Sequence, residues 1–394
     1  VLPGCGKDDG RRAVLAGRPE RRPLFIRSVV SIIFHNIDYA KMGAMTCGPN
    51  KTRAGRLASN GKLDPIAKIR LGVNDPPLHP IRLSPMPPTH LLLALLVVAI
   101  WGTNFAIIKI GLETWPPLLF VALRFALSAL PLFLLPRPRA PLGSVIAYGL
   151  LLGVGQFGVL FYAMQHDISP GLAALVIQMQ VFFTIALSAL LNREAIGRLQ
   201  LLGLSLALAG MVVIGCNVGS SGGGAVLTLH GLLLVLFAAT CWAAANLVVK
   251  RLGTVDVLSL VAWSSAWPAV ALALLSLVLE GPREIAAAFR AAGTTAWLAA
   301  VWQAVGNTLL GFGAWSWLLA RHPAATVTPM ALLVPVFGLG ASAMLLAEPL
   351  QTWKIAAATL VLAGLGIIVR ASIRDTGRRF TSATSPPASP PPRR

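Results

Sequence analysis

The stretch Ile100–Gly111, IWGTNFAIIKIG, lies inside the first long apolar run of the chain, yet it carries a tryptophan, an asparagine and a lysine. A polar side chain inside an apolar run of membrane length is costly, so its presence indicates a function. A second copy, CWAAANLVVKRLG, follows at Cys241–Gly253. Trp101 corresponds to Trp242 at a separation of 141 residues, and each is followed eight residues later by a lysine. The rest of the chain is interpreted around these two segments.

The composition is that of a polytopic membrane protein. Of the 394 residues, 56% are hydrophobic and 12% are charged, with a mean hydropathy of +0.73, whereas a soluble domain has about 25% charged residues. The net charge of +19 could suggest nucleic-acid binding, but cytoplasmic loops of membrane proteins are enriched in Lys and Arg, and we predict no nucleic-acid partner. The four cysteines form no metal-ligand spacing and no Walker-type loop is present, so neither a metal nor a cofactor is predicted.

Ten apolar segments follow one another from His90 onward, and a membrane-spanning helix needs about 20 such residues. They cover 90–112, 117–135, 143–165, 171–191, 198–216, 230–249, 257–279, 296–320, 324–346 and 353–370. The sequence therefore predicts an all-α polytopic membrane protein with ten transmembrane helices.

The distribution of Lys and Arg predicts the orientation. With the segment before the first span in the cytoplasm, the cytoplasmic side holds most of the loop cations, namely Arg137, Arg139, Arg193, Arg198, Lys250, Arg251, Arg321, Arg370, Arg374, Arg378 and Arg379. The outside then holds Arg283, Arg290 and Lys354. Because cytoplasmic loops carry the excess of positive charge, both termini are predicted to be cytoplasmic.

The two ends of the chain differ from the middle. Residues 1–85 are rich in Arg, Gly and Pro and have no apolar run of membrane length, so we predict that they are disordered. A sharper hypothesis is that Met86, which is followed almost at once by a span, is the native start and that residues 1–85 are not native protein. Residues 371–394 are polar and then Pro-rich, and are predicted to form a disordered cytoplasmic tail.

Internal similarity indicates a five-span unit that occurs twice. Phe161–Glu194 aligns with Trp315–Glu348 at a separation of 154 residues. The larger separation fits an insertion within Glu280–Thr295, which we predict to be the longest outside loop. The repeats are placed at 86–216 and 228–370. Because five is odd, the second repeat enters the membrane from the opposite side, giving the inverted arrangement of many secondary transporters; channels and membrane enzymes can have it too.

Motifs in both halves match one known family. They are WGTNFAIIKIGL at 101–112, the Glu-then-LLGLSLALAGMVVIG pattern at 194–215, and AEPLQTWKIAAATLVLAGLGIIV at 347–369. On these residues the chain resembles the EamA family of the drug/metabolite transporter superfamily. PGLAALVIQMQVFFTI at 170–185 and TPMALLVPVFGLGASAMLLAE at 328–348 make it most similar to the cysteine/O-acetylserine exporter group. The resemblance implies ten helices around a central cavity, alternating access, and export of small metabolites.

The candidate substrate-binding residues are polar or aromatic side chains within predicted spans, namely Trp101, Asn104, Arg124, Gln156, Gln178, Gln180, Trp242, Asn246 and Asn307. An amide can bond a substrate carboxylate or ammonium group. Asn104, which has a copy at Asn246, could instead make a helix–helix hydrogen bond worth about 1 kcal/mol. Gln178 and Gln180 point about 200° apart on a helix, so at most one faces a cavity and the other must bond a neighbouring helix. Gln303 adds a further amide to the eighth span.

Arg124 is the one basic residue well inside a predicted span. It could attract a substrate carboxylate; the alternatives are snorkelling to the outer interface or bonding to backbone carbonyls. Lys109 and Lys250 lie nearer the span ends and are interpreted as end markers. Trp101 and Trp242 lie deep enough to wall a cavity, although packing is the common role of such residues.

Two prolines in the ninth predicted span, Pro329 and Pro335, interrupt its hydrogen-bond ladder and are candidate hinge residues. No Asp, Glu or His lies mid-span. That pattern disfavours proton coupling through a buried carboxylate and favours facilitated or exchange transport. Glu194 and Glu348 lie at span ends and are predicted to be structural, holding the start of the next helix or pairing with a loop cation.

Taken together, these features predict a secondary transporter of the cell (inner) membrane that exports a small-molecule substrate, such as cysteine or O-acetylserine, with the lipid bilayer as its surroundings. The alternative is a non-transport membrane protein, either a receptor or an enzyme. An enzyme would need an intramembrane nucleophile with a base, or paired metal ligands, and the sequence contains neither arrangement.

Overall fold

A computed structural model describes residues 86–192, 197–219, 226–253 and 255–384 of the chain. The predictions for residues 1–85, for Glu194 and for residues 385–394 lie outside these ranges. The first half is made of α4 (Pro88–Leu112), α5 (Pro117–Ala129), η1 (Leu130–Phe133), α6 (Leu142–Leu150), η2 (Leu151–Gly158), α7 (Val159–His166), α8 (Pro170–Val176), α9 (Met179–Asn192) and α10 (Arg198–Cys216). The second half is made of α11 (Leu229–Leu252), α12 (Val257–Leu279), α13 (Pro282–Ala291), α14 (Thr294–Val301), η4 (Trp302–Leu310), α15 (Gly311–Arg321), α16 (Ala324–Val327), η5 (Thr328–Leu333), α17 (Val334–Leu346) and α18 (Thr352–Thr384).

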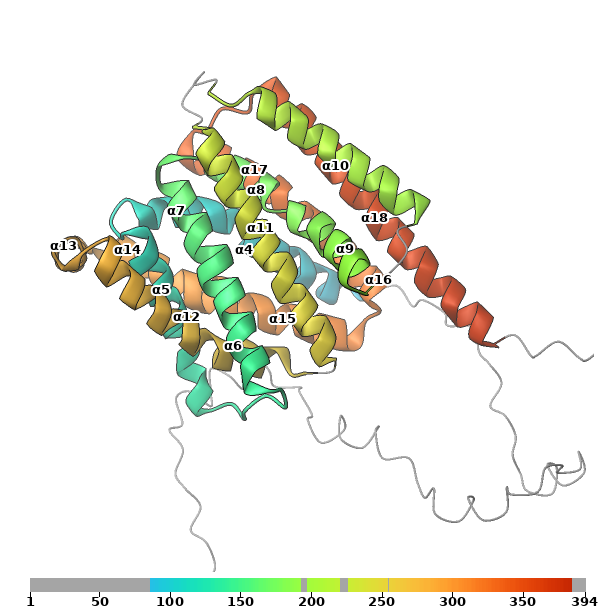
Figure 1. Ribbon diagram of the computed structural model, residues 1–394, viewed down its shortest axis with the longest axis horizontal. Helices are drawn as coiled ribbons and strands as arrows, with labels where there is room; N and C mark the ends of the chain where they lie inside the picture. Colours follow the sequence, from blue (N-terminus) through green and yellow to red (C-terminus); the bar gives the residue numbers. More distant parts are fainter. Residues whose placement is uncertain (1–85, 193–196, 220–225, 254, 385–394) are drawn as a thin grey trace, which may run out of the picture. The chain divides into compact units, whose positions relative to one another are not determined.

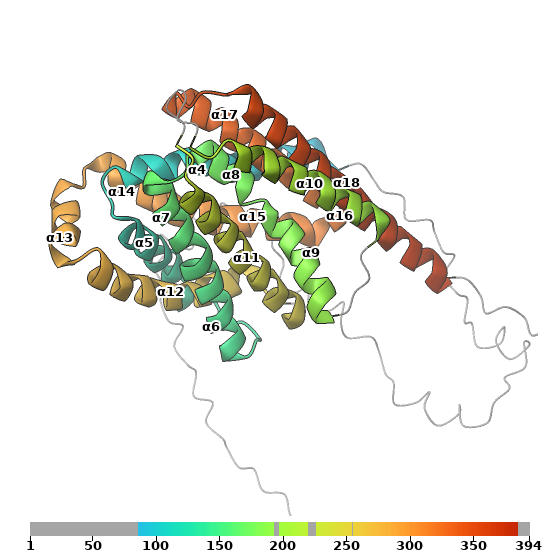
Figure 2. The same ribbon diagram turned by 45° about the horizontal axis from the view of Figure 1, so that its top comes forward.

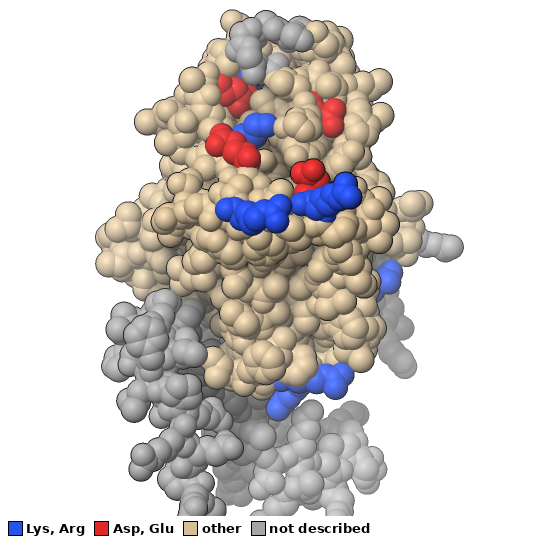
Figure 3. All heavy atoms as spheres, turned by 90° about the vertical axis from the view of Figure 1, so that its left-hand side faces the viewer, with Lys and Arg blue, Asp and Glu red and all other residues tan. Residues whose placement is uncertain are grey.

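The helices begin where the sequence supplies the appropriate chemistry. Proline opens α4, α5, α8 and α13, where its missing N–H costs no hydrogen bond. Thr228 and Asp256 cap α11 and α12 by accepting hydrogen bonds from Gly231 and Ser259. The helices are apolar on their outer faces, as Leu233 and Phe237 of α11 show. On the face in Figure 3, an uncharged band separates two groups of charged side chains.

Eight helices in the described part of the chain are long and apolar enough to cross a membrane. A ninth is obtained when α13 and the run Thr294–Arg321, which meet at an angle of 107°, are counted as one bent span. The remaining predicted span, 117–135, is the shorter helix Pro117–Phe133. The chain is therefore an all-helical polytopic membrane protein.

Two segments differ from the sequence prediction. The outside loop predicted at Glu280–Thr295 contains helix α13, whose Pro282 and first-turn Glu284 are helix-starting residues. The last span was predicted to end at residue 370, with disorder from 371, but α18 continues to Thr384. No proline occurs between Thr352 and Thr384 to interrupt the helix.

The third and fourth helical runs of each half are irregular in their middle. The third runs contain the π-helical segments η2 and η4. The fourth runs contain the break at 177–178, between α8 and α9, and the 3₁₀ segment η5. Segments of π and 3₁₀ helix expose carbonyls that a regular helix would use internally, and they often lie at functional sites.

Helices pack across the two halves of the sequence. The close pairs are α4 with α17, α9 with α11, α5 with α12, and α10 with α18. Helices α10 and α18 lie side by side in both ribbon views (Figures 1 and 2). A Cβ added at Gly364 would lie 2.5 Å from the carbonyl oxygen of Gly203, and one at Gly210 would lie 3.1 Å from that of Ala357. The contact partner moves down α18 as the residue number rises along α10, so these two helices run antiparallel.

This contact gives the first prediction. Gly364→Leu should lower the thermal unfolding midpoint of the purified protein, because its side chain would collide with the backbone of α10, an overpacking cost of about 1–3 kcal/mol. Gly366→Leu is the matched control, since nothing lies within 4 Å of a Cβ there. Both substitutions raise helix propensity by a similar amount. Equal midpoints for the two variants would contradict the packing.

Candidate functional site

A buried chain of polar side chains joins α4, η4 and α5. The Gln303 amide donates from Nε2 to Asn104 Oδ1 at 2.8 Å, and its Oε1 accepts from Arg124 Nη1 at 3.0 Å. Asn104 is 4% exposed, Gln303 0% and Arg124 1%. The sequence included Asn104 and Arg124 among the candidates but left Gln303 out. Its position four residues before Asn307, on the same helical run, was the available signal.

Arg124 is held without a carboxylate. Its guanidinium carbon lies 3.7 Å from the centre of the Phe157 ring and 5.5 Å from that of Phe125. Within the described ranges, its Nε has no hydrogen-bond partner. Neither alternative from the sequence describes this position, because the side chain is enclosed and bonds the side chain of Gln303. Phe157, on η2, was not a sequence candidate, although it follows Gln156 directly.

A second polar cluster joins α11 and α9. Asn246 donates from Nδ2 to Gln180 Oε1 at 2.9 Å and to Thr184 Oγ1 at 3.3 Å. Gln180 is thus the glutamine of the pair that bonds a neighbouring helix. Gln178 lies in the break between α8 and α9, is 6% exposed, and makes no side-chain hydrogen bond with the described residues. The two repeat-related asparagines therefore bond different helices.

Trp101 and Asn307 meet at the π-helical segment η4. The indole N–H of Trp101 donates to the backbone carbonyl of Asn307 at 3.2 Å. The ring also packs against Phe312 and Trp315, with centroids 5.5 and 5.2 Å apart. The Asn307 side chain is buried, at 5% exposure. Trp101 thereby provides a hydrogen-bond donor for a backbone carbonyl in the second half of the chain.

The remaining candidates are not joined to these clusters by side-chain hydrogen bonds. Gln156 lies on η2 and is 1% exposed, and no residue that the structure describes bonds its Oε1. Trp242, on α11, is half-buried and packs against the apolar core. The hinge candidates lie at the starts of two consecutive segments of the irregular ninth run, with Pro329 in the first turn of η5 and Pro335, which is buried, in the first turn of α17.

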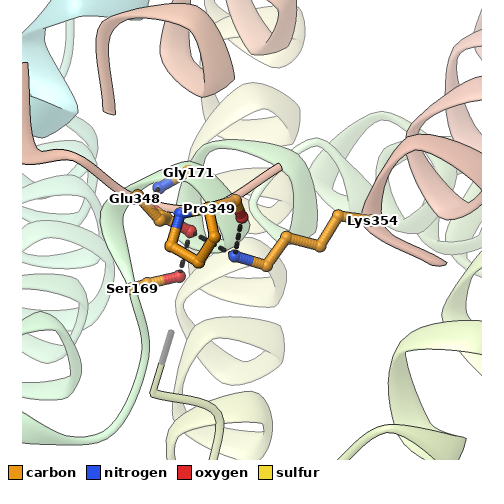
Figure 4. Close-up of polar contacts among 5 residues, drawn as sticks. All are labelled: Ser169, Gly171, Glu348, Pro349 and Lys354. Atoms are coloured by element: carbon orange, nitrogen blue, oxygen red, sulfur yellow. Dashed lines mark hydrogen bonds and ion pairs between the residues drawn. The ribbon is translucent and has the colours of Figure 1, made fainter. Parts of the chain in front are cut away.

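A buried ion pair lies where the start of α8 meets the connection between α17 and α18 (Figure 4). Glu348 accepts from Ser169 Oγ at 2.6 Å, from the backbone N–H of Gly171 at 3.0 Å and from Lys354 Nζ at 2.8 Å. Lys354 is 0% exposed and also donates to the Pro349 carbonyl. Glu348 thus caps the start of α8, and not of the next helix α18 as one prediction had it. It also pairs with the cation Lys354, in agreement with the alternative prediction.

The two lysines interpreted as end markers contact neighbouring helices. Lys109 donates to the carbonyls of Met164 and Gln165 at 3.2 and 2.8 Å, at the C-terminal end of α7, where a cation is favourable. Lys250 donates to Ser188 Oγ of α9 at 2.8 Å.

A cavity of about 900 Å³ opens between α5, α7, α12 and α13. Its walls are mainly apolar, and its polar lining includes Glu113, Glu280 and Glu284. Glu280 accepts from the backbone N–H groups of Leu118 and Leu119 and so caps α5. None of the nine candidate residues lines this cavity. Within the described ranges, no three His, Cys, Asp or Glu side chains gather as a metal site.

Membrane-length helices with buried polar contacts between two halves define a class, the polytopic membrane proteins. The sequence profile of the EamA-like transporter family matches residues 89–216 and again 229–370. The chain belongs to the EamA-like transporter family. This is a family of transporters and not of enzymes, so the membrane-enzyme alternative is set aside.

Two bacterial relatives match nearly their whole length. A "probable amino-acid metabolite efflux pump" of Salmonella typhimurium is 41% identical over 295 residues, which cover 72% of this chain and 98% of that protein. A protein of the same description from Escherichia coli strain K12 is 39% identical over 282 residues, covering 70% of this chain and 93% of that protein. A solved crystal structure superposes with a TM-score of 0.50 at 19% identity, over 73% of this chain and 99% of its own, and therefore supports the fold alone.

The buried ion pair gives the second prediction. Lys354→Met should destabilise the purified protein by about 3–5 kcal/mol, because it leaves the Glu348 carboxylate buried without its cation. Glu348→Gln should have a similar effect, and the double variant should lose less than the sum of the two single losses. Glu284→Gln, at an exposed position of α13, is the control and should stay within about 0.5 kcal/mol of the parent protein. Additive losses in thermal unfolding would show that the pair is not coupled.

Proposed function

We propose that this protein exports amino-acid metabolites from the cell by alternating access across the inner membrane. The observation that carries the proposal is the buried chain Asn104–Gln303–Arg124, which links the first half of the chain to the second within membrane-length helices. Such groups are expensive in a bilayer and mark substrate pathways. The description of the relatives as probable amino-acid metabolite efflux pumps supports the same substrate class.

The proposed architecture is ten spans in two inverted five-helix repeats, at 86–216 and 228–370, with both termini cytoplasmic. The antiparallel contact of α10 with α18, the last helices of the two repeats, supports the inversion. Pro117–Phe133 is the tenth span in this proposal. Its 17 residues extend about 25 Å at 1.5 Å per residue, close to the thickness of a bilayer core.

In the proposed mechanism, the two repeats rock against each other around a midplane site. Of the nine candidate side chains, Gln180 holds a neighbouring helix through Asn246 and the others form the substrate path, with Asn104 and Asn246 at its centre. The irregular segments η2, η4 and η5 allow their helices to bend, and Pro329 and Pro335 are the hinges of the ninth span. Cysteine and O-acetylserine are the proposed substrates. Transport is facilitated or by exchange, since the buried carboxylate Glu348 is neutralised by Lys354.

The third prediction tests this function. Bacteria that produce the full chain should withstand toxic concentrations of cysteine and should release labelled amino acids faster than cells with an empty vector. Asn104→Leu should reduce this export at least about fivefold, because it leaves the buried Gln303 amide unpaired, a loss of about 1–3 kcal/mol.

Thr103→Val on the same helix is the matched control, because the Thr103 hydroxyl bonds only nearby carbonyls of α4. Its export should equal that of the parent protein. The amount of each variant in the membrane must be measured by immunoblot. No release of any amino acid by the parent protein would contradict the proposed function, and full export by Asn104→Leu would remove Asn104 from the site.

A further inference from the structure

Among the described residues, two cations are fully buried, and only one of them is paired with a carboxylate. Lys354 is 0% exposed and pairs with the Glu348 carboxylate at 2.8 Å. Arg124 is 1% exposed, and in the part of the chain that the structure describes no carboxylate pairs with it. A buried charge without an opposite charge is strongly destabilising. The protein neutralises one buried cation and leaves the other with neutral neighbours.

The neighbours of Arg124 position its guanidinium without neutralising it. Gln303 accepts one hydrogen bond at Nη1, and the Phe157 ring covers the planar face at 3.7 Å. Nε is buried and has no hydrogen-bond partner among the described residues. The edge of the guanidinium that carries Nε is therefore free to donate. A planar edge with two N–H groups is the geometry that binds a carboxylate in a bidentate manner.

The internal repeat argues against a role in the scaffold alone. At the separation that relates Trp101 to Trp242, Arg124 corresponds to Ser265. Ser265 is 2% exposed, and its hydroxyl donates to the Val261 carbonyl of its own helix at 2.6 Å. The second repeat thus fills the equivalent position with a small, satisfied side chain. Helices α5 and α12 pack against each other, and since α12 has a serine at this position, their packing does not require a cation at the position of Arg124.

The large cavity lies on the same elements as Arg124 and Phe157. Leu118 of α5 and Gly158 of η2 line it, and Leu118 is six residues from Arg124, about 9 Å along the helix. Glu113 and Glu284, both exposed, belong to its lining. The cavity thus offers carboxylates, and the buried guanidinium of Arg124 lies farther along α5. This arrangement matches a zwitterion whose ammonium group faces the carboxylates of the cavity and whose carboxylate faces Arg124.

We propose that Arg124 binds the carboxylate of the transported metabolite. The substrate carboxylate supplies the negative charge that no described protein group provides for Arg124. Gln303, which bonds Asn104, keeps the guanidinium oriented toward that carboxylate. The substrates are thus molecules with a free carboxylate, and their esters are excluded. This assignment rests on the proposed function and adds the group that recognises the substrate.

The test uses the full chain purified into liposomes. Release of each of the twenty common amino acids and of O-acetyl-L-serine is measured, and each one that the parent protein releases is then competed with its methyl ester. The parent protein should be inhibited by the free acid and not by the ester. Arg124→Gln should reduce release at least about tenfold, the loss expected for one charge-assisted hydrogen bond, and should no longer distinguish acid from ester.

Two further variants separate recognition from folding. Gln303→Glu places a carboxylate within reach of Nη1, so it should raise the thermal unfolding midpoint while reducing release of the free acid. Arg124→Lys retains the charge without the planar fork and should keep part of the activity. Arg137→Gln, at an exposed loop position, is the matched control and should behave as the parent protein.

The outcomes are distinguishable. If the parent protein releases none of the compounds, the proposed function and this inference both fail. If the parent protein releases amino acids and either Arg124→Gln or Gln303→Glu releases them equally well, the inference fails alone. A folded Arg124→Gln that loses activity but still prefers the acid over its ester as an inhibitor also overturns it, because that result assigns Arg124 a structural role.

Discussion

Polar groups inside a bilayer find no water to bond, so leaving one without a partner within the protein is costly. This constraint organises the interior of the molecule. Trp101 takes up a carbonyl of the π-helical segment η4, and Gln303 bonds Asn104. Asn246 bonds Gln180 on α9. Since lipid competes equally for apolar helix surfaces, such directional bonds contribute to the association of the halves where apolar contacts alone do not.

The span positions could be predicted from the sequence because they depend on local apolar length, a property that each segment carries itself. Helix α13 and the extension of α18 to Thr384 were missed because polar helices carry no such signal. The π-helical segments were also missed. They arise where tertiary partners take up freed carbonyls, and the glycines Gly153 and Gly155 of η2 were only an indirect sign of them.

The candidate residues could be recognised as polar outliers, but their hydrogen-bond partners could not be predicted. Gln303 bonds Asn104 across 199 residues of sequence, and no local pattern specifies that pairing. The shared motif of Asn104 and Asn246 suggested equivalent roles, yet one bonds the eighth helical run and the other the fourth. For Arg124 the sequence suggested a substrate carboxylate, the outer interface or backbone carbonyls as partners. It could not suggest Phe157, because the aromatic ring that covers Arg124 becomes a neighbour only in the folded chain.

The two repeats are alike in how their helices pack but differ in the polar side chains of the interior. The contact of α10 with α18 is symmetric, since Gly203 meets Gly364 as Ala357 meets Gly210. The polar interior is not, since Arg124 corresponds to Ser265. A transporter of two similar halves can exchange their roles at little cost in energy, so its inward-open and outward-open states stay close in free energy. The substrate itself has no such symmetry. A scaffold that repeats and a binding surface that does not are therefore both expected, and the positions where the repeats diverge in chemistry are where a substrate can be recognised.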